Sequence, residues 1–223
     1  MPIQTFSFPN TLLRQALIAI EGVVGNVGFN AILRRANMEQ YITNLPPDNQ
    51  ELGLTSADYA RLNRTIQDFF GRGSPAILYK IGEVVFENLL VYQFSIPSLH
   101  TISDPVLTHA QKCRIALIEL ARFAEAMNPN GTRTIAVSDA GVLHFTIQRC
   151  SICWEQTSAT PVCQFYAGVV SAAIRFTLHR SYRVKEIECS AMGAPHCRFE
   201  AHIATPLATL PAVFDKLPAM QVP

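Results

Sequence analysis

Apolar residues recur at helical spacing through most of the first 131 residues. Five such stretches, separated by Gly, Pro and Asn, predict helices at 9–25, 30–42, 56–73, 74–94 and 104–131. Asn10 and Ser56 are residue types that cap helix N-termini, and Pro75 suits a first helical turn. The N-terminal half is therefore predicted to be helical.

The helix predicted at 9–25 is apolar on nearly all sides, since its few polar residues interrupt both of its faces only briefly. A helix with so little polar surface is usually buried in a core or in an oligomer interface. Residues 1–25 are thus a candidate surface for a homodimer. Gly22, Gly25 and Gly28 follow a helix and not a strand, so they are interpreted as helix breaks and not as a phosphate-binding loop.

From residue 133 the period of the pattern changes from 3.6 to 2. RTIAVSDAGVLHFTIQRC predicts a β-hairpin, residues 161–179 a helix, and YRVKEIEC with CRFEAHI a second hairpin around SAMGAPH. This order predicts an α+β fold, in which the helical N-terminal half packs on an antiparallel sheet made of two β-hairpins flanking a helix. We expect one domain over residues 1–223, with residues 133–205 as its hairpin-helix-hairpin part.

Composition narrows the functional classes. With 18 Lys and Arg against 17 Asp and Glu, the chain has no long-range field to attract nucleic acid. Hydrophobic residues make up 49% and charged residues 16%, which predicts a large core, an apolar cavity or a buried partner surface. The start lacks the features of a signal peptide, and no apolar run long enough for a transmembrane segment is evident, so a cytoplasmic protein is expected.

Six cysteines in a reducing compartment indicate metal binding, reactivity or core packing, and not disulfides. Strand alternation places Cys189 and Cys197 near each other and facing the core, and Cys163 lies where a helix begins, which favours its thiolate. Three thiolates and one further ligand would form a closed tetrahedral zinc site, although free cysteines are more often core residues. Candidates for the fourth ligand are Glu186, Glu188, His196, Cys150 and Cys153.

The C-terminal part resembles a known family. VCQFYAGVVSAAI followed by EIECSAMGAPHCRFE is similar to the signature of the 4-vinyl reductase domain family, in which a Cys begins a Gly-containing helix and E-x-x-C-x-x-x-G-x-x-x-C-x-F follows. GFNAILRRANMEQYITNLPP and YARLNRTIQDFFGRGSPAILYKIGEVVF resemble the N-terminal part of the family. The resemblance therefore covers most of residues 20–205.

The resemblance implies a structural zinc ion held by Cys163, Glu186, Cys189 and Cys197, because the phenol-sensing regulators of the family bind zinc through the matching positions. Regular alternation would place Glu186 and Cys189 on opposite faces of their strand. Both can bind one ion only if the strand bulges or if Cys189 lies in the turn. Cys150 and Cys153 stay open between a second metal site, a redox pair and core packing.

The resemblance also implies a ligand-binding fold shared with nitric-oxide-signalling and Golgi-transport proteins. No nucleophile elbow, metalloprotease motif, Walker loop or dinucleotide fingerprint is present, and the six histidines are scattered, so a binding protein is favoured over an enzyme. Similar stand-alone proteins of photosynthetic bacteria indicate a tetrapyrrole, a chlorophyll precursor or bilin, bound by an accessory factor in pigment biosynthesis or photosystem assembly. Candidates to pair with its propionates are Arg34, Arg35, Arg61 and Arg72.

Three alternatives to a tetrapyrrole-binding accessory protein remain at this point. The first is a sensor of small aromatic or lipid-like ligands that acts through a protein partner. The second is a vinyl-tetrapyrrole reductase, although the sequence has no recognisable site for its hydride donor. The third is an assembly subunit without a ligand.

Overall fold

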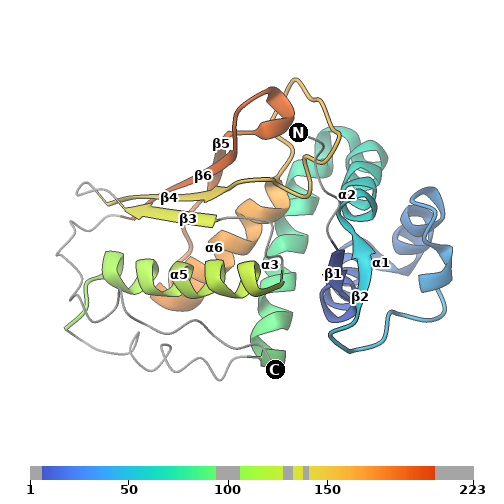
Figure 1. Cartoon of the computed structure of the whole chain (residues 1–223), viewed down its shortest axis with the longest axis horizontal. Helices are drawn as coiled ribbons and strands as arrows, with labels where there is room; N and C mark the ends of the chain where they lie inside the picture. The colour runs from blue at the N-terminus through green and yellow to red at the C-terminus, as the bar shows by residue number, and fades with distance from the viewer. Residues whose placement is uncertain (1–6, 94–105, 128–132, 138–140, 204–223) are drawn as a thin grey trace.

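The computed structural model describes residues 7–93, 106–127, 133–137 and 141–203, and the account below concerns these residues (Figure 1). The helices in these ranges are α1 (Asn10–Arg35), α2 (Ser56–Phe70), α3 (Ser74–Gln93), α5 (His109–Met127) and α6 (Gln164–Leu178). The strands are β1 (Ser7–Pro9), β2 (Leu52–Thr55), β3 (Arg133–Val137), β4 (Val142–Ile147), β5 (Lys185–Glu188) and β6 (Cys197–His202). Short 3-10 helices are η1 (Glu39–Tyr41), η2 (Gly71–Gly73) and η3 (Ser190–Met192).

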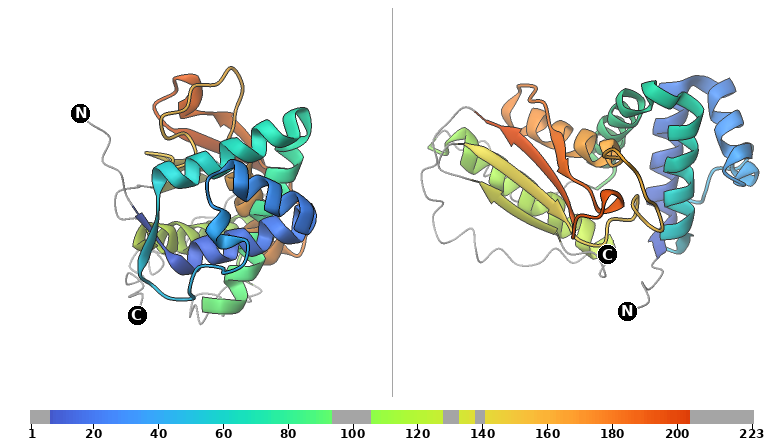
Figure 2. Two further views of the ribbon diagram at one scale, coloured as in Figure 1. Left: turned by 90° about the vertical axis from the view of Figure 1, so that its right-hand side faces the viewer. Right: turned by 90° about the horizontal axis from the view of Figure 1, so that it is seen from above.

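The larger sheet is antiparallel, with the strand order β3-β4-β6-β5. Each predicted hairpin is present, and pairing of β4 with β6 joins the two hairpins. One face of the sheet is covered by α5 and α6 (Figures 1 and 2). Period-2 alternation explains this arrangement, since Leu143, Phe145 and Phe199 are buried on that face. The predicted α+β class with an antiparallel sheet is confirmed.

The helix α3 joins the two halves of the molecule. It packs against α6 on one side and against α1 and α2 on the other, so the N-terminal helices lie beyond α3 from the sheet (Figure 2). At the crossing with α6, Gly82 faces the backbone of Phe165, and Gly168 faces the backbone of Tyr79. The two glycines allow the helix backbones to approach each other directly.

The N-terminal helices differ from the prediction. The helix predicted at 9–25 and the start of the one predicted at 30–42 form a single kinked element, α1. Gly25 marks the kink, with φ 74° and ψ 164°, a backbone conformation that essentially only glycine adopts. Leu17, Ile20 and Ile32 of α1 are buried within the chain, so most of its apolar surface belongs to the molecule's own core.

By length and composition α1 could cross a membrane, because an 18-residue window within it has a mean hydropathy of 1.7. This differs from the expectation that the chain has no apolar run of transmembrane length. Within the structure, however, 39% of that window is buried, and the kink at Gly25 divides the helix. Core helices of folded domains share these features, so α1 alone does not indicate a membrane protein.

Two further differences are local. Leu52–Thr55, expected to lie in a loop, forms β2 and pairs with β1 as a small two-stranded sheet. The N-cap of α2 is Thr55 and not Ser56, because Thr55 and Asp58 exchange the two hydrogen bonds of a capping box. For the helix predicted at 104–131, α5 spans the middle, and residues 104, 105 and 128–131 lie outside the described residues.

Candidate metal centre and ligand cavity

Five of the six cysteines meet at one end of the larger sheet. Cys150 and Cys153 lie in the bends after β4, Cys163 is the N-cap residue of α6, Cys189 follows β5, and Cys197 begins β6. All five are reduced in the structure, and only Cys153 is more than slightly exposed. Four segments that are distant in the sequence therefore converge on one group of sulfur atoms.

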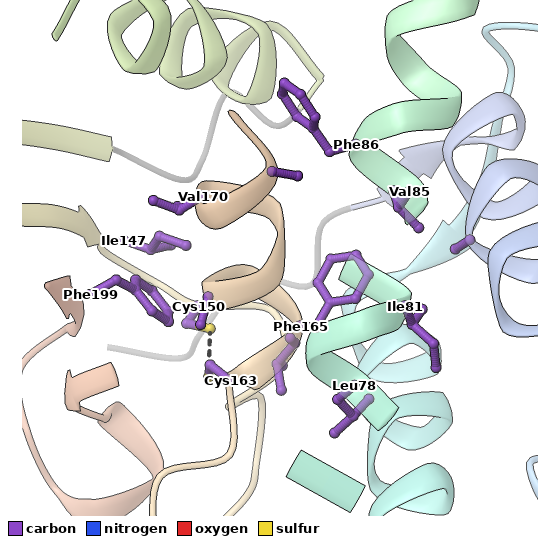
Figure 3. Close-up of a cluster of buried hydrophobic side chains, with 14 of the residues drawn as sticks. Leu78, Ile81, Val85, Phe86, Ile147, Cys150, Cys163, Phe165, Val170 and Phe199 are labelled. Carbon is purple, nitrogen blue, oxygen red and sulfur yellow. Dashed lines mark hydrogen bonds between the residues drawn. The ribbon is translucent and has the colours of Figure 1, made fainter. Parts of the chain in front are cut away.

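The sulfur atoms are in contact. Cys153 Sγ lies 3.2 Å from Cys163 Sγ, 3.4 Å from Cys197 Sγ and 3.6 Å from Cys189 Sγ. Cys163 Sγ lies 3.5 Å from Cys150 Sγ, a contact drawn in Figure 3, and 3.7 Å from Cys197 Sγ. Four thiolates at 2.3 Å from a tetrahedral zinc ion would be about 3.8 Å apart, so the spacing suits one ion better than separate disulfides.

Two sets of donors are close enough to hold a metal ion, with all donor atoms of a set within 4.8 Å of one another. One set is Cys150, Cys153, Cys163 and Cys197, and the other is Cys163, Glu186, Cys189 and Cys197. A cluster of four cysteines in this geometry could thus bind a metal ion. Thiolate donors of this kind suit zinc and other soft or borderline ions.

The structure resolves the conflict over Glu186 and Cys189. The pairing of β5 with β6 shifts register between Glu186 and Glu188, and Cys189 lies beyond the end of β5. Both side chains can therefore face the cluster, as the sequence allowed only for a bulge or a turn position. The second set contains all four residues that the resemblance implied.

Glu186 is an unusual group for a buried position. Its Oε2 accepts a hydrogen bond of 2.7 Å from the backbone N–H of Cys163, while its Oε1 is buried without a hydrogen-bond partner. Burial, with the nearby Cys189 thiol, raises the pKa of Glu186 to about 9. An unsatisfied buried carboxyl oxygen beside thiols is the chemistry expected at a cation site, so the residues present fit a metal ion.

The thiols influence one another's protonation. Burial raises the pKa of Cys163, whereas the hydrogen bond with Cys153 lowers the pKa of Cys189 to about 6. Without a cation, the cluster would have to keep most of its thiols protonated, because several adjacent thiolates repel one another.

The other expected donors lie elsewhere. Glu188 forms ion pairs with His196 at 2.6 Å and with Arg198 at 3.2 Å, so neither Glu188 nor His196 joins the cluster. The sixth cysteine, Cys113, is buried alone in α5, where burial raises the pKa of its thiol to about 12. Cys113 is thus a core residue.

An apolar cavity of about 110 Å³ lies where the helical half meets the sheet half. Its walls come from the N-terminal segment, α1, β2, α2, α3, α5, β3 and α6. The lining residues are Phe8, Leu12, Leu13, Ala16, Leu54, Tyr59, Val85, Leu89, Leu120, Phe123, Ala124, Arg133, Phe165, Tyr166 and Val169. Among these, Arg133 alone carries a charge. Figure 3 shows Phe165 between α6 and α3, near Val85.

The cavity and the cysteine cluster share the first turns of α6. Cys163 precedes the helix, and Phe165, Tyr166 and Val169 line the cavity. The hydroxyl groups of Tyr166 and Ser151 are hydrogen-bonded at 2.8 Å, and Ser151 lies between Cys150 and Cys153. A change at the cluster can therefore move the cavity wall directly.

A second, open groove of about 840 Å³ runs along α3, α6 and residues 181–186. Lys80, Arg183 and Lys185 contribute positive charge to it, and Glu83 and Glu186 contribute negative charge. Its end at Glu186 brings this groove close to the cysteine cluster.

The arginines expected to pair with propionates are placed differently. None of Arg34, Arg35, Arg61 and Arg72 lines the described cavity or groove. Arg61 instead bonds to Asp58 and to the carbonyl oxygen of Ala36. Arg133, on β3, is the cavity arginine, and no local signal in the sequence indicates it because its position depends on how β3 packs against α5 and α6.

Comparison with known proteins gives one family. Residues 143–203, from β4 to just beyond β6, match the model of the 4-vinyl reductase domain. This agrees with the family resemblance of the sequence, whose motif lies within and just before that segment.

Two relatives extend the comparison. The chain is 25% identical over 193 residues to the bacteriochlorophyll synthase 23 kDa chain of Cereibacter sphaeroides, covering 86% of this chain and 88% of that protein. It is 30% identical over 74 residues to an uncharacterized protein of Methanocaldococcus jannaschii, covering 33% of this chain and 41% of that protein. The matched segment thus spans less than half the length of the archaeal relative.

Solved structures with the same fold are H-NOX domains. An oxygen-binding H-NOX domain related to soluble guanylate cyclases aligns with a TM-score of 0.57 at 10% identity, covering 91% of this chain and 98% of that one. A structure from work on heme distortion in the H-NOX family aligns with a TM-score of 0.58 at 11% identity, with the same coverage. At such low identity, the likeness concerns the fold, and it confirms the predicted nitric-oxide-signalling type of architecture.

Proposed function

We propose that this chain, which carries a 4-vinyl reductase domain in residues 143–203, binds a small apolar molecule in the cavity between its helical half and its sheet. The observation that supports this most is the cavity itself, which is lined almost wholly by apolar and aromatic side chains. Ligand sites in proteins are typically apolar pockets with a few polar groups that orient the ligand. Here Arg133 and the hydroxyl groups of Tyr59 and Tyr166 are those groups.

We propose a tetrapyrrole as the ligand class and an accessory role in pigment biosynthesis or photosystem assembly. The relative named as a bacteriochlorophyll synthase 23 kDa chain supports this, as it aligns over most of both chains. A tetrapyrrole carries carboxylates, and the Arg133 guanidinium could pair with one of them. At about 110 Å³ the cavity must widen several-fold to reach the roughly 300–1,000 Å³ of sites for larger ligands.

The cavity volume favours a second candidate, a sensor of small aromatic compounds that signals through a partner. An apolar cavity of about 150 Å³ is large enough to hold benzene. The cavity described here is of that order without any rearrangement. The two candidates differ in whether binding requires α6 and α3 to move apart.

A substitution that fills the cavity tests the binding site. We expect Val169→Phe to lower ligand affinity about ten-fold or more, because its ring would occupy the space between α6 and the N-terminal helices. Binding of protoporphyrin IX, followed by its absorption spectrum, tests the first ligand class. Thermal shift with toluene and phenol tests the second.

The matched control is Val27→Phe, the same exchange at a position of α1 that is 85% exposed. It should bind as the wild type does. If Val169→Phe folds and binds both ligand types with unchanged affinity, the cavity is not the binding site. If the wild type binds neither, the proposed function itself is wrong.

We further propose that the cysteine cluster binds a structural zinc ion. The ligand set implied by the sequence, Cys163, Glu186, Cys189 and Cys197, has all donor atoms within 4.8 Å of one another. With four protein ligands the ion would have no open position for a substrate. It would fix the start of α6 against the ends of β5 and β6, and so hold one wall of the cavity in place.

The remaining expectations also stay proposals. A homodimer would now have to use residues 21–28, because the first turns of α1 are buried in the chain's own core while Val27 is exposed. A single domain over residues 1–223 and a cytoplasmic location are proposed on the same footing as the homodimer. The reduced state of the five clustered cysteines agrees with a reducing compartment.

A further inference from the structure

The fourth ligand of the proposed zinc ion is open to question, because Cys153 lies closer to the other thiols than the sequence indicated. Its Sγ atom is within 3.6 Å of the Sγ atoms of Cys163, Cys189 and Cys197. These are the three cysteines that the sequence assigned to the metal. Cys153 thus already contacts every thiol of the set.

These contacts suit a tetrahedron of sulfur atoms. For zinc with bonds of 2.3 Å, each edge of the tetrahedron measures about 3.8 Å. The edges from Cys153 measure 3.2, 3.4 and 3.6 Å, and the edge between Cys163 and Cys197 measures 3.7 Å. The remaining pairs, within Cys163, Cys189 and Cys197, lie below 4.8 Å. Small rotations of the side chains would therefore place all four sulfur atoms around one ion.

Glu186 has another role available. Its Oε2 holds the backbone N–H of Cys163 at 2.7 Å, at the start of α6. A carboxylate in this position satisfies one of the N–H groups that a helix N-terminus leaves unpaired. Its Oε1 has no partner, which keeps Glu186 within reach of the ion, but zinc in closed structural sites is commonly held by four thiolates.

Cys189 is better prepared than Cys150 for the remaining position. The carbonyl oxygen of Cys189 accepts hydrogen bonds from the N–H groups of Met192 and Ala194, and Ser190 N–H donates to Cys197 Sγ. The turn between β5 and β6 thus fixes both of its cysteines, as preorganised metal sites require. Cys150, by contrast, lies among the core side chains Ile147 and Phe199 (Figure 3).

We infer that Cys153, and not Glu186, completes an all-thiolate centre with Cys163, Cys189 and Cys197. Glu186 supports this centre from outside by positioning Cys163, and Cys150 is a fifth thiol that does not bind the ion. This inference rests on the proposed zinc site, and it changes the ligand that the resemblance implied. It also gives the C-x-x-C pair unequal roles.

X-ray absorption of the zinc-loaded full-length chain tests the ligand count directly. We expect four sulfur neighbours at about 2.3 Å, whereas the set with Glu186 would give three sulfurs and one oxygen at about 2.0–2.2 Å. This measurement needs no variant, so a folding defect cannot obscure it. A spectrum with three sulfurs and one oxygen would overturn the inference while leaving the zinc site intact.

Cobalt substitution of three variants then identifies the ligands. Cys153→Ala should lose about a quarter of the sulfur-to-cobalt charge-transfer absorption, because one of four thiolates is removed. Cys150→Ala, a matched thiol three residues away, should keep the full absorption. Glu186→Gln should keep it too, even if metal affinity falls by about 10–100-fold, as is typical for outer partners of a ligand.

The contrary outcomes are distinct. If Glu186→Gln changes the cobalt spectrum and Cys153→Ala does not, the ligand set from the resemblance is right. If Cys150→Ala reduces the absorption and Cys189→Ala leaves it intact, Cys150 and not Cys189 is the fourth thiolate, and the inferred set is wrong. If the wild-type chain binds neither zinc nor cobalt, the metal centre itself is refuted.

Discussion

Removing the metal is expected to lower the melting temperature of this chain by about 8–16 °C. This value assumes free zinc at about a thousand times its dissociation constant, which stabilises the folded state by about 4 kcal/mol. For chains of about 150–250 residues, each kcal/mol corresponds to roughly 2–4 °C. The measurement is thermal unfolding, followed by circular dichroism, with and without a strong chelator.

The physical reason is that the ion would join segments with few other ties. Cys153, Cys163, Cys189 and Cys197 come from the loop after β4, the start of α6, the end of β5 and the start of β6. Without the ion, this end of the sheet would contain buried thiols in contact and a buried carboxyl group with an unsatisfied oxygen. Such groups stabilise a fold only when they are paired.

Cys163→Ala should reproduce the effect of the chelator, because Cys163 belongs to every candidate ligand set. Its melting temperature should be low and should no longer respond to chelation. Cys113→Ala is the control: this thiol is equally buried, but it lies in α5 away from the cluster. That variant should lose some stability through its small cavity and keep the full response to chelator. A wild-type chain whose unfolding is the same with and without chelator would contradict the prediction.

The same experiment bears on ligand binding. Cys163 is followed by Phe165 and Tyr166, which line the cavity, and Tyr166 is hydrogen-bonded to Ser151 within the C-x-x-C loop. Loss of the ion should therefore loosen the wall formed by α6 and weaken binding of any ligand in the cavity. A metal-free protein that binds its ligand with unchanged affinity would show that the two sites are independent.

The sequence alone predicted the larger features because they depend on periodicity. The change from period 3.6 to period 2 at residue 133 separates the helical half from the hairpins, and Leu143, Phe145 and Phe199 face the core as alternation requires. The position of Cys163 at a helix start was also readable from local signals, although the helix begins at Gln164, later than expected. Such features follow from residues that are close in the chain.

What the sequence could not predict depends on contacts between distant segments. The pairing of β1 with β2 is held by three residues on each side, too few for a recognisable pattern. The placement of Cys153 against three other thiols depends on how an irregular loop folds over the end of the sheet. The C-x-x-C spacing was the one available signal, and it could not distinguish a metal ligand from a core thiol. Arg133 entered the cavity for the same kind of reason.

The crossing of α3 and α6 leads to the second large effect. Gly168→Ala should destabilise the fold by about 3 kcal/mol, or roughly 6–12 °C in melting temperature. A Cβ atom at this position would overlap the carbonyl oxygen of Tyr79 in α3, and it would lie 3.1 Å from the backbone nitrogen of Glu83. Because both neighbours are backbone atoms of a helix, neither can rotate away, and the two helices would have to separate.

The sign of this effect is informative, because intrinsic helix propensity points the other way. Alanine is favoured over glycine inside a helix by about 1 kcal/mol, so a helix free of this contact would gain stability. Gly73→Ala is the matched control, since a Cβ there meets no atom within 4 Å and should cost little. Gly82→Ala should behave like Gly168→Ala, because its Cβ would overlap the carbonyl oxygen of Phe165. If Gly168→Ala melts at or above the wild-type temperature while Gly73→Ala is neutral, the helices do not cross in direct backbone contact. In that case the cavity bounded by α3 and α6 would be wider than the structure describes, and a ligand of tetrapyrrole size would need less rearrangement to enter.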